Sequence, residues 1–159
     1  MKVLALGGSG GMGRFSSFAI SNYPNITKVT IADLNEDNAK EFSNLFDDRF
    51  TGIGLDVTDK EHLEKVMFGH DIVLNTTGPF FKFGLPILKS AIKCKCHYFD
   101  ICDDWEPTEE MLKLNDEALK SEITAIVGLG ASPGISNLLG LKAMNELDKT
   151  ESIITGWDV

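Results

Sequence analysis

The sequence predicts an α/β fold in which a doubly wound parallel sheet lies between two layers of helices, giving a three-layer α/β/α arrangement. Short apolar runs rich in β-branched residues alternate with longer segments of helical period along the whole chain. Each intervening segment is long enough for the helix of a right-handed crossover between parallel strands. A chain of 159 residues, 43% of them apolar, has the size and composition of one globular domain.

The strands are expected where apolar runs stop at turn-forming residues. In chain order they are residues 2–6, 28–32, 50–55, 72–75, 97–100 and 124–127, and each ends at or just before a Gly, Asp or Asn. A further strand is expected to begin at residues 152–157. Because the sequence stops soon afterwards, we expect residues 1–150 to form one domain and residues 151–159 to begin a truncated second domain for substrate binding and dimerisation.

The helices are expected between these strands, where the apolar residues recur with helical spacing. They are residues 11–22, 36–46, 60–68, 85–93, 108–121 and 135–147. Thr58 is expected to be the N-cap of the helix over residues 60–68, in a Ser/Thr-x-x-Glu capping box with Glu61. Pro24 and Pro107 suit a loop and a first helical turn, and residues 80–83 are read as an aromatic loop.

Charge and cysteine content exclude several classes of protein. A formal net charge of −9 argues against nucleic-acid binding, because most of the surface would repel a polyanion. The first apolar stretch, residues 3–6, is too short for a signal peptide or a membrane span, so no membrane contact and a cytoplasmic location are expected. Cys94, Cys96 and Cys102 lack the spacing of a zinc or redox motif, which predicts reduced thiols and no metal.

A glycine-rich turn follows the first strand and opens the first helix. It contains, in the pattern G-x-G-x-x-G, the residues Gly8, Ser9, Gly10, Gly11, Met12 and Gly13. In this position the glycines permit a sharp turn, a close approach of a pyrophosphate to the backbone, and close packing of helix on strand. The amides of the helix N-terminus then face the negative charge. The placement predicts a Rossmann fold that binds a dinucleotide.

An acidic residue supports this interpretation. The second strand ends at Asp33, twenty residues beyond Gly13, where a carboxylate can accept hydrogen bonds from the adenosine ribose. A carboxylate suits the free 2′-hydroxyl of NAD and repels the 2′-phosphate of NADP, although Arg14 could offset part of that repulsion. We therefore expect NAD as cofactor, with NADP as the alternative.

Further cofactor contacts are expected where other strands end, because a dinucleotide lies along the carboxyl ends of the strands in an open parallel sheet. Asp56 and Val57 follow the third strand and could meet the adenine, or could simply begin a turn before Thr58. A polar turn follows the fourth strand where the nicotinamide ribose should pass, and its expected contacts are Thr76, Thr77 and Gly78.

The glycine spacing also fits extended short-chain dehydrogenases, which need a Tyr-x-x-x-Lys pair for acid catalysis. The two tyrosines, Tyr23 and Tyr98, are followed four positions later by Thr27 and Cys102, so that reading fails.

Four stretches carry a different resemblance, and they are residues 3–13, 75–80, 97–104 and 128–137. Together they resemble the saccharopine dehydrogenase family, in the branch of saccharopine reductases and lysine 6-dehydrogenases. The resemblance implies an NAD(P)-dependent oxidoreductase acting on a carbon–nitrogen bond of an amino acid, with this chain as the cofactor-binding domain and a homodimer as the complete protein. Asp33 departs from the Ser-Arg type pair of NADP-using members.

Candidate catalytic residues follow the fifth strand, where Cys102, Asp103 and Asp104 offer a thiol and two carboxylates; a solvated, helix-capping acidic turn is the alternative. Ser132, Pro133 and Gly134 precede the last helix, and their amides could receive a substrate carboxylate or only start that helix.

His97 begins a strand at the wrong end of the sheet for catalysis, which indicates a surface or packing role. A second function of a different class is a redox-sensing regulator that binds NAD(P) without turnover, because a fold alone does not establish catalysis.

Overall fold

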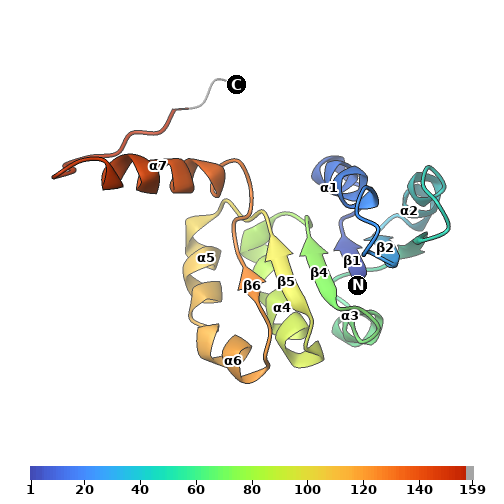
Figure 1. Cartoon of the computed structure of the whole chain (residues 1–159). Helices are drawn as coiled ribbons and strands as arrows, with labels where there is room; N and C mark the ends of the chain where they lie inside the picture. Colours follow the sequence, from blue (N-terminus) through green and yellow to red (C-terminus); the bar gives the residue numbers. More distant parts are fainter. Residues whose placement is uncertain (157–159) are drawn as a thin grey trace.

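The computed structural model describes residues 1–156 and has one six-stranded sheet at its centre (Figure 1). All strand pairs are parallel, and the strand order is β3-β2-β1-β4-β5-β6. The strands are β1 Lys2–Leu6, β2 Lys28–Asp33, β3 Phe50–Gly54, β4 Ile72–Asn75, β5 His97–Asp100 and β6 Ala125–Ile126. The order reverses next to β1, which confirms the doubly wound sheet that the sequence predicts.

Helices follow or connect the strands. They are α1 Gly11–Ser21, α2 Glu36–Ser43, α3 Lys60–Met67, α4 Phe80–Cys94, α5 Trp105–Leu112, α6 Asn115–Lys120 and α7 Ile135–Asn145. Among the described residues, no helix is long and apolar enough to cross a membrane.

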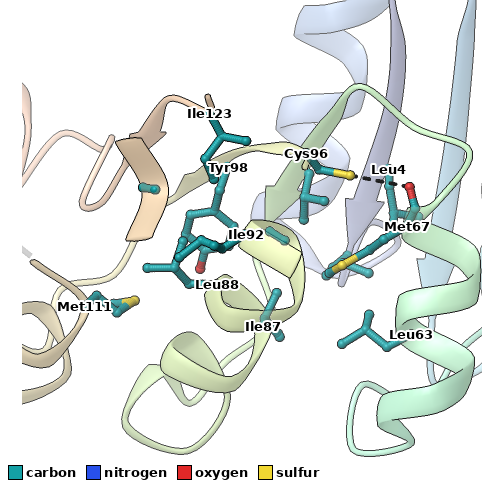
Figure 2. Close-up of a cluster of buried hydrophobic side chains, with 14 of the residues drawn as sticks. Leu4, Leu63, Met67, Ile87, Leu88, Ile92, Cys96, Tyr98, Met111 and Ile123 are labelled. Atoms are coloured by element: carbon teal, nitrogen blue, oxygen red, sulfur yellow. Dashed lines mark hydrogen bonds between the residues drawn. The ribbon is translucent and has the colours of Figure 1, made fainter. Parts of the chain in front are cut away.

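The core has two layers because side chains alternate across each strand. Leu4 and Leu6 of β1 belong to a cluster with α3, α4 and α5, whereas Val3 belongs to a second cluster with β2, β3 and α2. Figure 2 shows the first cluster, in which Ile87 and Leu88 of α4 lie between the side chains from α3 and α5. The two clusters cover the two faces of the sheet, as a three-layer fold requires.

Three helix predictions need correction. The aromatic segment 80–83 is the first turn of α4 rather than a loop, because Pro79 occupies the N-cap and Phe80 is buried in the core. The expected helix over 108–121 is two helices, α5 and α6. The chain turns at Leu114, whose N–H bonds to Met111 O, so that Leu114 can also enter the core.

The N-cap of α3 is Asp59, not Thr58. The Asp59 carboxylate accepts a hydrogen bond from the His62 N–H at 3.1 Å. The Thr58 hydroxyl instead donates to Asp56 Oδ1 at 2.7 Å, and Thr58 lies one residue before the N-cap position.

The thiols agree with the sequence prediction. Cys94, Cys96 and Cys102 are all free, and Cys94 and Cys96 lie where α4 ends. The Cys96 thiol is buried and donates to Met67 O at 3.4 Å (Figure 2). Burial raises the pKa of Cys96 to about 11, so this thiol stays protonated.

The segment after β6 differs from the rest of the fold. Helix α7 extends away from the sheet and has no buried residue (Figure 1). Residues 152–156 form no strand, so that part of the predicted strand is wrong, and Trp157 lies outside the described residues. The proposed boundary of a second domain at residue 151 stays a prediction.

One histidine, His70, links the sheet to α3. His70 Nε2 lies 2.8 Å from Thr30 Oγ1, and its Nδ1 lies 2.8 Å from Val66 O. Burial lowers the pKa of His70 below its ordinary value of 6.5. As pH falls below that value the unfolded chain takes up the proton first, so protonation favours unfolding.

We therefore expect the free energy of unfolding, measured with urea, to fall between pH 7 and pH 5 and to fall less in His70→Gln. The same substitution at the exposed His62 should leave the pH dependence of the wild type. Equal slopes in His70→Gln and the wild type would contradict this account.

Candidate coenzyme site

The glycine loop joins β1 to α1 and brings the helix unusually close to the strand. Gly7 has a φ of +66°, a left-handed conformation that only glycine adopts without strain. A Cβ at Gly13 would lie 2.2 Å from Gly7 O and 2.6 Å from Gly8 Cα. The spacing that the sequence motif suggested therefore has a steric cause in this fold.

The N-terminus of α1 is suited to an anion. Its N-cap, Gly10, supplies no side-chain hydrogen bond, and the first turn contains no acidic residue. The first amides of the helix point outward with the positive end of the helix dipole. Such an end binds phosphate groups without any basic side chain.

Asp33, at the end of β2, is joined to this loop. Its Oδ2 accepts hydrogen bonds from the Ser9 hydroxyl at 2.6 Å and from the Ser9 N–H at 3.3 Å. Arg14 Nε donates to Ser9 O at 2.8 Å, and the guanidinium lies 4.5 Å from the centre of the Phe42 ring. The glycine loop and the acidic strand end thus form one hydrogen-bonded unit.

A pocket of about 210 Å³ opens beside this unit. It brings together five of the residues that the sequence suggests for the cofactor: Asp33, Asp56, Val57, Thr77 and Gly78. They follow or end β2, β3 and β4; β2 and β4 are the two neighbours of β1, and β3 pairs with β2. Gly7 and the exposed Leu34 also line the pocket.

The two threonines after β4 differ in what their hydroxyls do. Thr76 donates to Leu6 O at 2.9 Å and to Gly7 O at 3.1 Å, so its side chain braces the glycine loop. Thr77 Oγ1 is buried and has no hydrogen-bond partner among residues 1–156. An unpaired buried hydroxyl is costly, and Thr77 is one of the residues that line the pocket.

Asp56 is held as a carboxylate. Its Oδ1 accepts from the hydroxyl and the N–H of Thr58, and these hydrogen bonds lower the pKa of Asp56 below its ordinary range. Together with Asp33, this residue makes the rim of the pocket acidic.

The residues suggested for catalysis and for substrate binding lie away from this pocket, beyond the carboxyl ends of β5 and β6. A second pocket, of about 660 Å³, lies between α5 and α7 and is lined by Asp103, Asp104, Ser132 and Pro133 among others. Asp104 stands at the N-cap of α5, but its Oδ2 accepts a hydrogen bond from the Phe81 N–H at 3.2 Å. Asp104 therefore ties α5 to the first turn of α4.

Cys102 and Gly134 have structural surroundings. Cys102 is fully buried, its sulfur lies 3.5 Å from Asp104 O and from Thr108 Oγ1, and burial raises the pKa of the thiol. Gly134 has a φ of +120°, and a Cβ there would lie 2.1 Å from Gly130 O. His97 Nδ1 accepts the Thr124 N–H at 2.9 Å, in line with the packing role expected for His97.

Sequence reasoning missed a buried polar network at the ends of β4 and β5. Asn75, Tyr98 and Asp100 are each 0% exposed. Asn75 Nδ2 donates to Tyr98 Oη at 3.0 Å, and Tyr98 Oη donates to Asp100 Oδ2 at 2.7 Å. Burial and the adjacent carboxylate raise the pKa of Tyr98 well above its usual range. The alternation Tyr-x-Asp within one strand, which puts both side chains on one face, was the available signal.

Comparisons with known proteins agree with this geometry. A family model described as the saccharopine dehydrogenase NADP binding domain matches residues 3–126. Saccharopine dehydrogenase [NADP(+), L-glutamate-forming] of Saccharomyces cerevisiae is 31% identical over 97 residues, which is 61% of this chain and 21% of that protein. The protein of the same name from Pyricularia oryzae is 30% identical over 120 residues, 76% of this chain and 25% of that protein. The chain thus spans about a fifth to a quarter of the length of these relatives.

Solved structures lead to the same family. Apo saccharopine dehydrogenase (L-Glu forming) from Saccharomyces cerevisiae superimposes with a TM-score of 0.78 at 28% identity, covering 91% of this chain and 31% of that one. UDP-N-acetylglucosamine 3-dehydrogenase from Acidithiobacillus ferrooxidans, with a TM-score of 0.58 and 16% identity over 80% of this chain and 38% of that one, shares the fold. On the match over residues 3–126, the chain belongs to the saccharopine dehydrogenase NADP-binding domain family.

Proposed function

We propose that this chain is the coenzyme-binding domain of an oxidoreductase that acts on a carbon–nitrogen bond of an amino acid. The observation that carries the proposal is that Asp33 is hydrogen-bonded to Ser9 of the glycine loop beside a pocket. This pocket lies next to β1, where the strand order of the sheet reverses. The names of the relatives, which are saccharopine dehydrogenases, support the substrate class. A homodimeric complete protein is proposed on the resemblance alone.

The residues of the site fit a nicotinamide dinucleotide. The amides at the start of α1 would receive the pyrophosphate, and Asp33 would receive ribose hydroxyls. Asp56 and Val57 would border the adenine, and Thr77 and Gly78 would lie under the nicotinamide ribose. When bound, the nicotinamide supplies the hydride chemistry, and the protein supplies position and exclusion of water.

We further propose that NAD is preferred over NADP. The family description and the names of the relatives give NADP, and Asp33 is the reason to expect a difference in this chain. A carboxylate would repel a 2′-phosphate. The next residue, Leu34, is exposed and apolar, so it offers no charge to receive that phosphate.

For the substrate side, we propose that Asp103 and Asp104 contact a substrate ammonium group or move a proton, and that Ser132, Pro133 and Gly134 border the substrate carboxylate. The shared pocket that Asp103, Asp104, Ser132 and Pro133 line supports this assignment. Cys102, buried with a raised thiol pKa, would act by positioning the Asp103–Asp104 turn rather than as a nucleophile.

Isothermal titration of the purified protein with NAD⁺, NADH, NADP⁺ and NADPH tests the proposal. We expect saturable binding of the NAD forms at lower concentration than the NADP forms. Failure to bind any of the four would remove the proposed function. Oxidation of saccharopine, lysine and related amines by the complete protein would then test the reaction class, and coenzyme binding without turnover would favour a regulator.

The Thr77 hydroxyl gives a prediction with opposite effects on stability and binding. Thr77→Val removes a buried unpaired hydroxyl and should leave the free energy of unfolding unchanged or raise it by about 1 kcal/mol. The same change should weaken NAD⁺ binding about fivefold to tenfold by removing one hydrogen bond.

The conservative control for that residue is Thr77→Ser, which keeps the hydroxyl and should bind NAD⁺ nearly as tightly as the wild type. Denaturant unfolding and titration measure the two quantities. Wild-type affinity in Thr77→Val would show that the ligand does not use this hydroxyl.

A further inference from the structure

A buried carboxylate closes the polar network beneath the ends of β4, β5 and β6. The donor and the acceptor of each hydrogen bond in the network can be assigned. The Asn75 amide donates to Tyr98 Oη, and Tyr98 Oη in turn donates to Asp100 Oδ2. Asn75 cannot turn its amide round, because its Oδ1 accepts the Thr77 N–H at 3.0 Å. The network therefore ends on Asp100 as an acceptor.

The other contacts of Asp100 are donors as well. Its Oδ1 accepts the Gly128 N–H at 2.8 Å and the Cys102 N–H at 3.0 Å. A neutral acid could donate its proton only to Tyr98 Oη, whose own proton would then have no acceptor in the network. Both Asp100 oxygens therefore act as hydrogen-bond acceptors, as those of a carboxylate do.

This negative charge has no cationic partner. None of the ion pairs formed by residues 1–156 includes Asp100. The neighbouring Asp103 and Asp104 have the same sign. Arg14 of α1 and Lys82 of α4 lie over the Phe42 and Phe83 rings. A charge that is 0% exposed acts on its surroundings through a medium of low dielectric constant.

The position of Asp100 relates this charge to the coenzyme. Asp100 ends β5, and its bonded partners begin the loops after β5 and β6. Through Asn75 it is connected to Thr77, which lines the pocket. With the adenosine half over β2 and β3, as the proposed function requires, the nicotinamide half lies over β4 to β6.

We propose that Asp100 is a selectivity residue that favours the oxidised coenzyme. The nicotinamide ring carries a positive charge when oxidised and none when reduced, so a buried anion below it attracts only the oxidised form. The inference rests on the proposed function, because it needs a dinucleotide in this site. It assigns to the domain a preference that neither its fold nor its glycine loop would supply.

The test compares dissociation constants for NAD⁺, NADH and ADP-ribose in the wild type and in Asp100→Asn. In this substitution the amide oxygen can still accept from the two backbone N–H groups. We expect the ratio of NADH to NAD⁺ dissociation constants to fall about fivefold or more, as opposite unit charges across a partly screened interior predict. ADP-ribose has no nicotinamide, so its affinity should stay the same.

A matched control separates charge from structure. Tyr98→Phe breaks the same network but keeps the carboxylate, and should leave the NADH to NAD⁺ ratio close to that of the wild type. Equal weakening of all three ligands in Asp100→Asn, or the same ratio change in both variants, would overturn the proposal.

A measurement on the wild type alone covers the case in which Asp100→Asn does not fold. The proposal requires wild-type protein to bind NAD⁺ at least as tightly as NADH, and clearly tighter binding of NADH would refute it. If the protein binds ADP-ribose but binds NADH more tightly than NAD⁺, only this inference is rejected. Failure to bind ADP-ribose or either coenzyme rejects the proposed function and this inference with it.

Discussion

Replacement of Gly13 by alanine should abolish coenzyme binding and destabilise the domain. The added Cβ would lie 2.2 Å from Gly7 O and 2.6 Å from Gly8 Cα, and both of these are backbone atoms of the glycine loop. Because no flexible side chain can yield, α1 must move away from the loop. Overpacking of this kind costs about 3 kcal/mol, which corresponds to a fall in melting temperature of roughly 6–12 °C for a domain of this size.

The effect on binding should be about as large as the effect on stability. Moving α1 displaces the amides that would receive the pyrophosphate, and we expect NAD⁺ affinity to fall at least about a hundredfold. Calorimetric titration and a thermal melt measure the two effects. Gly69→Ala is the matched control, because a Cβ at Gly69 meets nothing within 4 Å. A Gly13→Ala protein that binds NAD⁺ normally would refute the role given to the loop.

Replacing Asp33 by serine and Leu34 by arginine should change which coenzyme the domain prefers. Asp33→Ser removes a carboxylate that would accept ribose hydroxyls, and hydrogen bonds to a charged group contribute about 1.5–3 kcal/mol each. NAD⁺ affinity should therefore fall by about tenfold to a hundredfold. Adding Leu34→Arg supplies a guanidinium for a 2′-phosphate, so the double variant should bind NADP⁺ more tightly than NAD⁺.

Asp48→Ser is the control for the loss of charge alone. Asp48 is exposed and lies just before the first residue of β3, at the end of the strands opposite to the pocket. This substitution should leave the preference for NAD⁺ unchanged. Asp33 also holds Ser9, so a melting curve must show that the variants are folded before the affinities are compared. Tighter binding of NADP⁺ than NAD⁺ by the wild type would contradict our assignment of Asp33.

Much of the fold could be predicted from local patterns. β1, β4 and β5 have the bounds expected from their apolar runs. A parallel strand that is buried on both faces is marked in the sequence by such a run. The errors arose where tertiary packing decides the structure. The Phe80 segment resembles a loop in isolation and becomes helical because Phe80 is buried, and Leu114 interrupts a continuous helical pattern in order to reach the core.

The candidate site shows the same division. The glycine spacing and the distance to Asp33 pointed to residues that the structure joins through Ser9. Spacing could not tell that the Thr76 hydroxyl is used by the loop while the Thr77 hydroxyl is unpaired, because the partners are about seventy residues away in sequence. The connection from Asn75 through Tyr98 to Asp100 also depends on the pairing of β4 with β5.

The most direct test of the account is a crystal structure of the protein with NAD⁺. We predict the pyrophosphate against the first amides of α1, the adenosine ribose within hydrogen-bond distance of the Asp33 carboxylate, and the nicotinamide over the ends of β4 and β5. Dinucleotide bound anywhere else, or a ribose that makes no contact with Asp33, would contradict it.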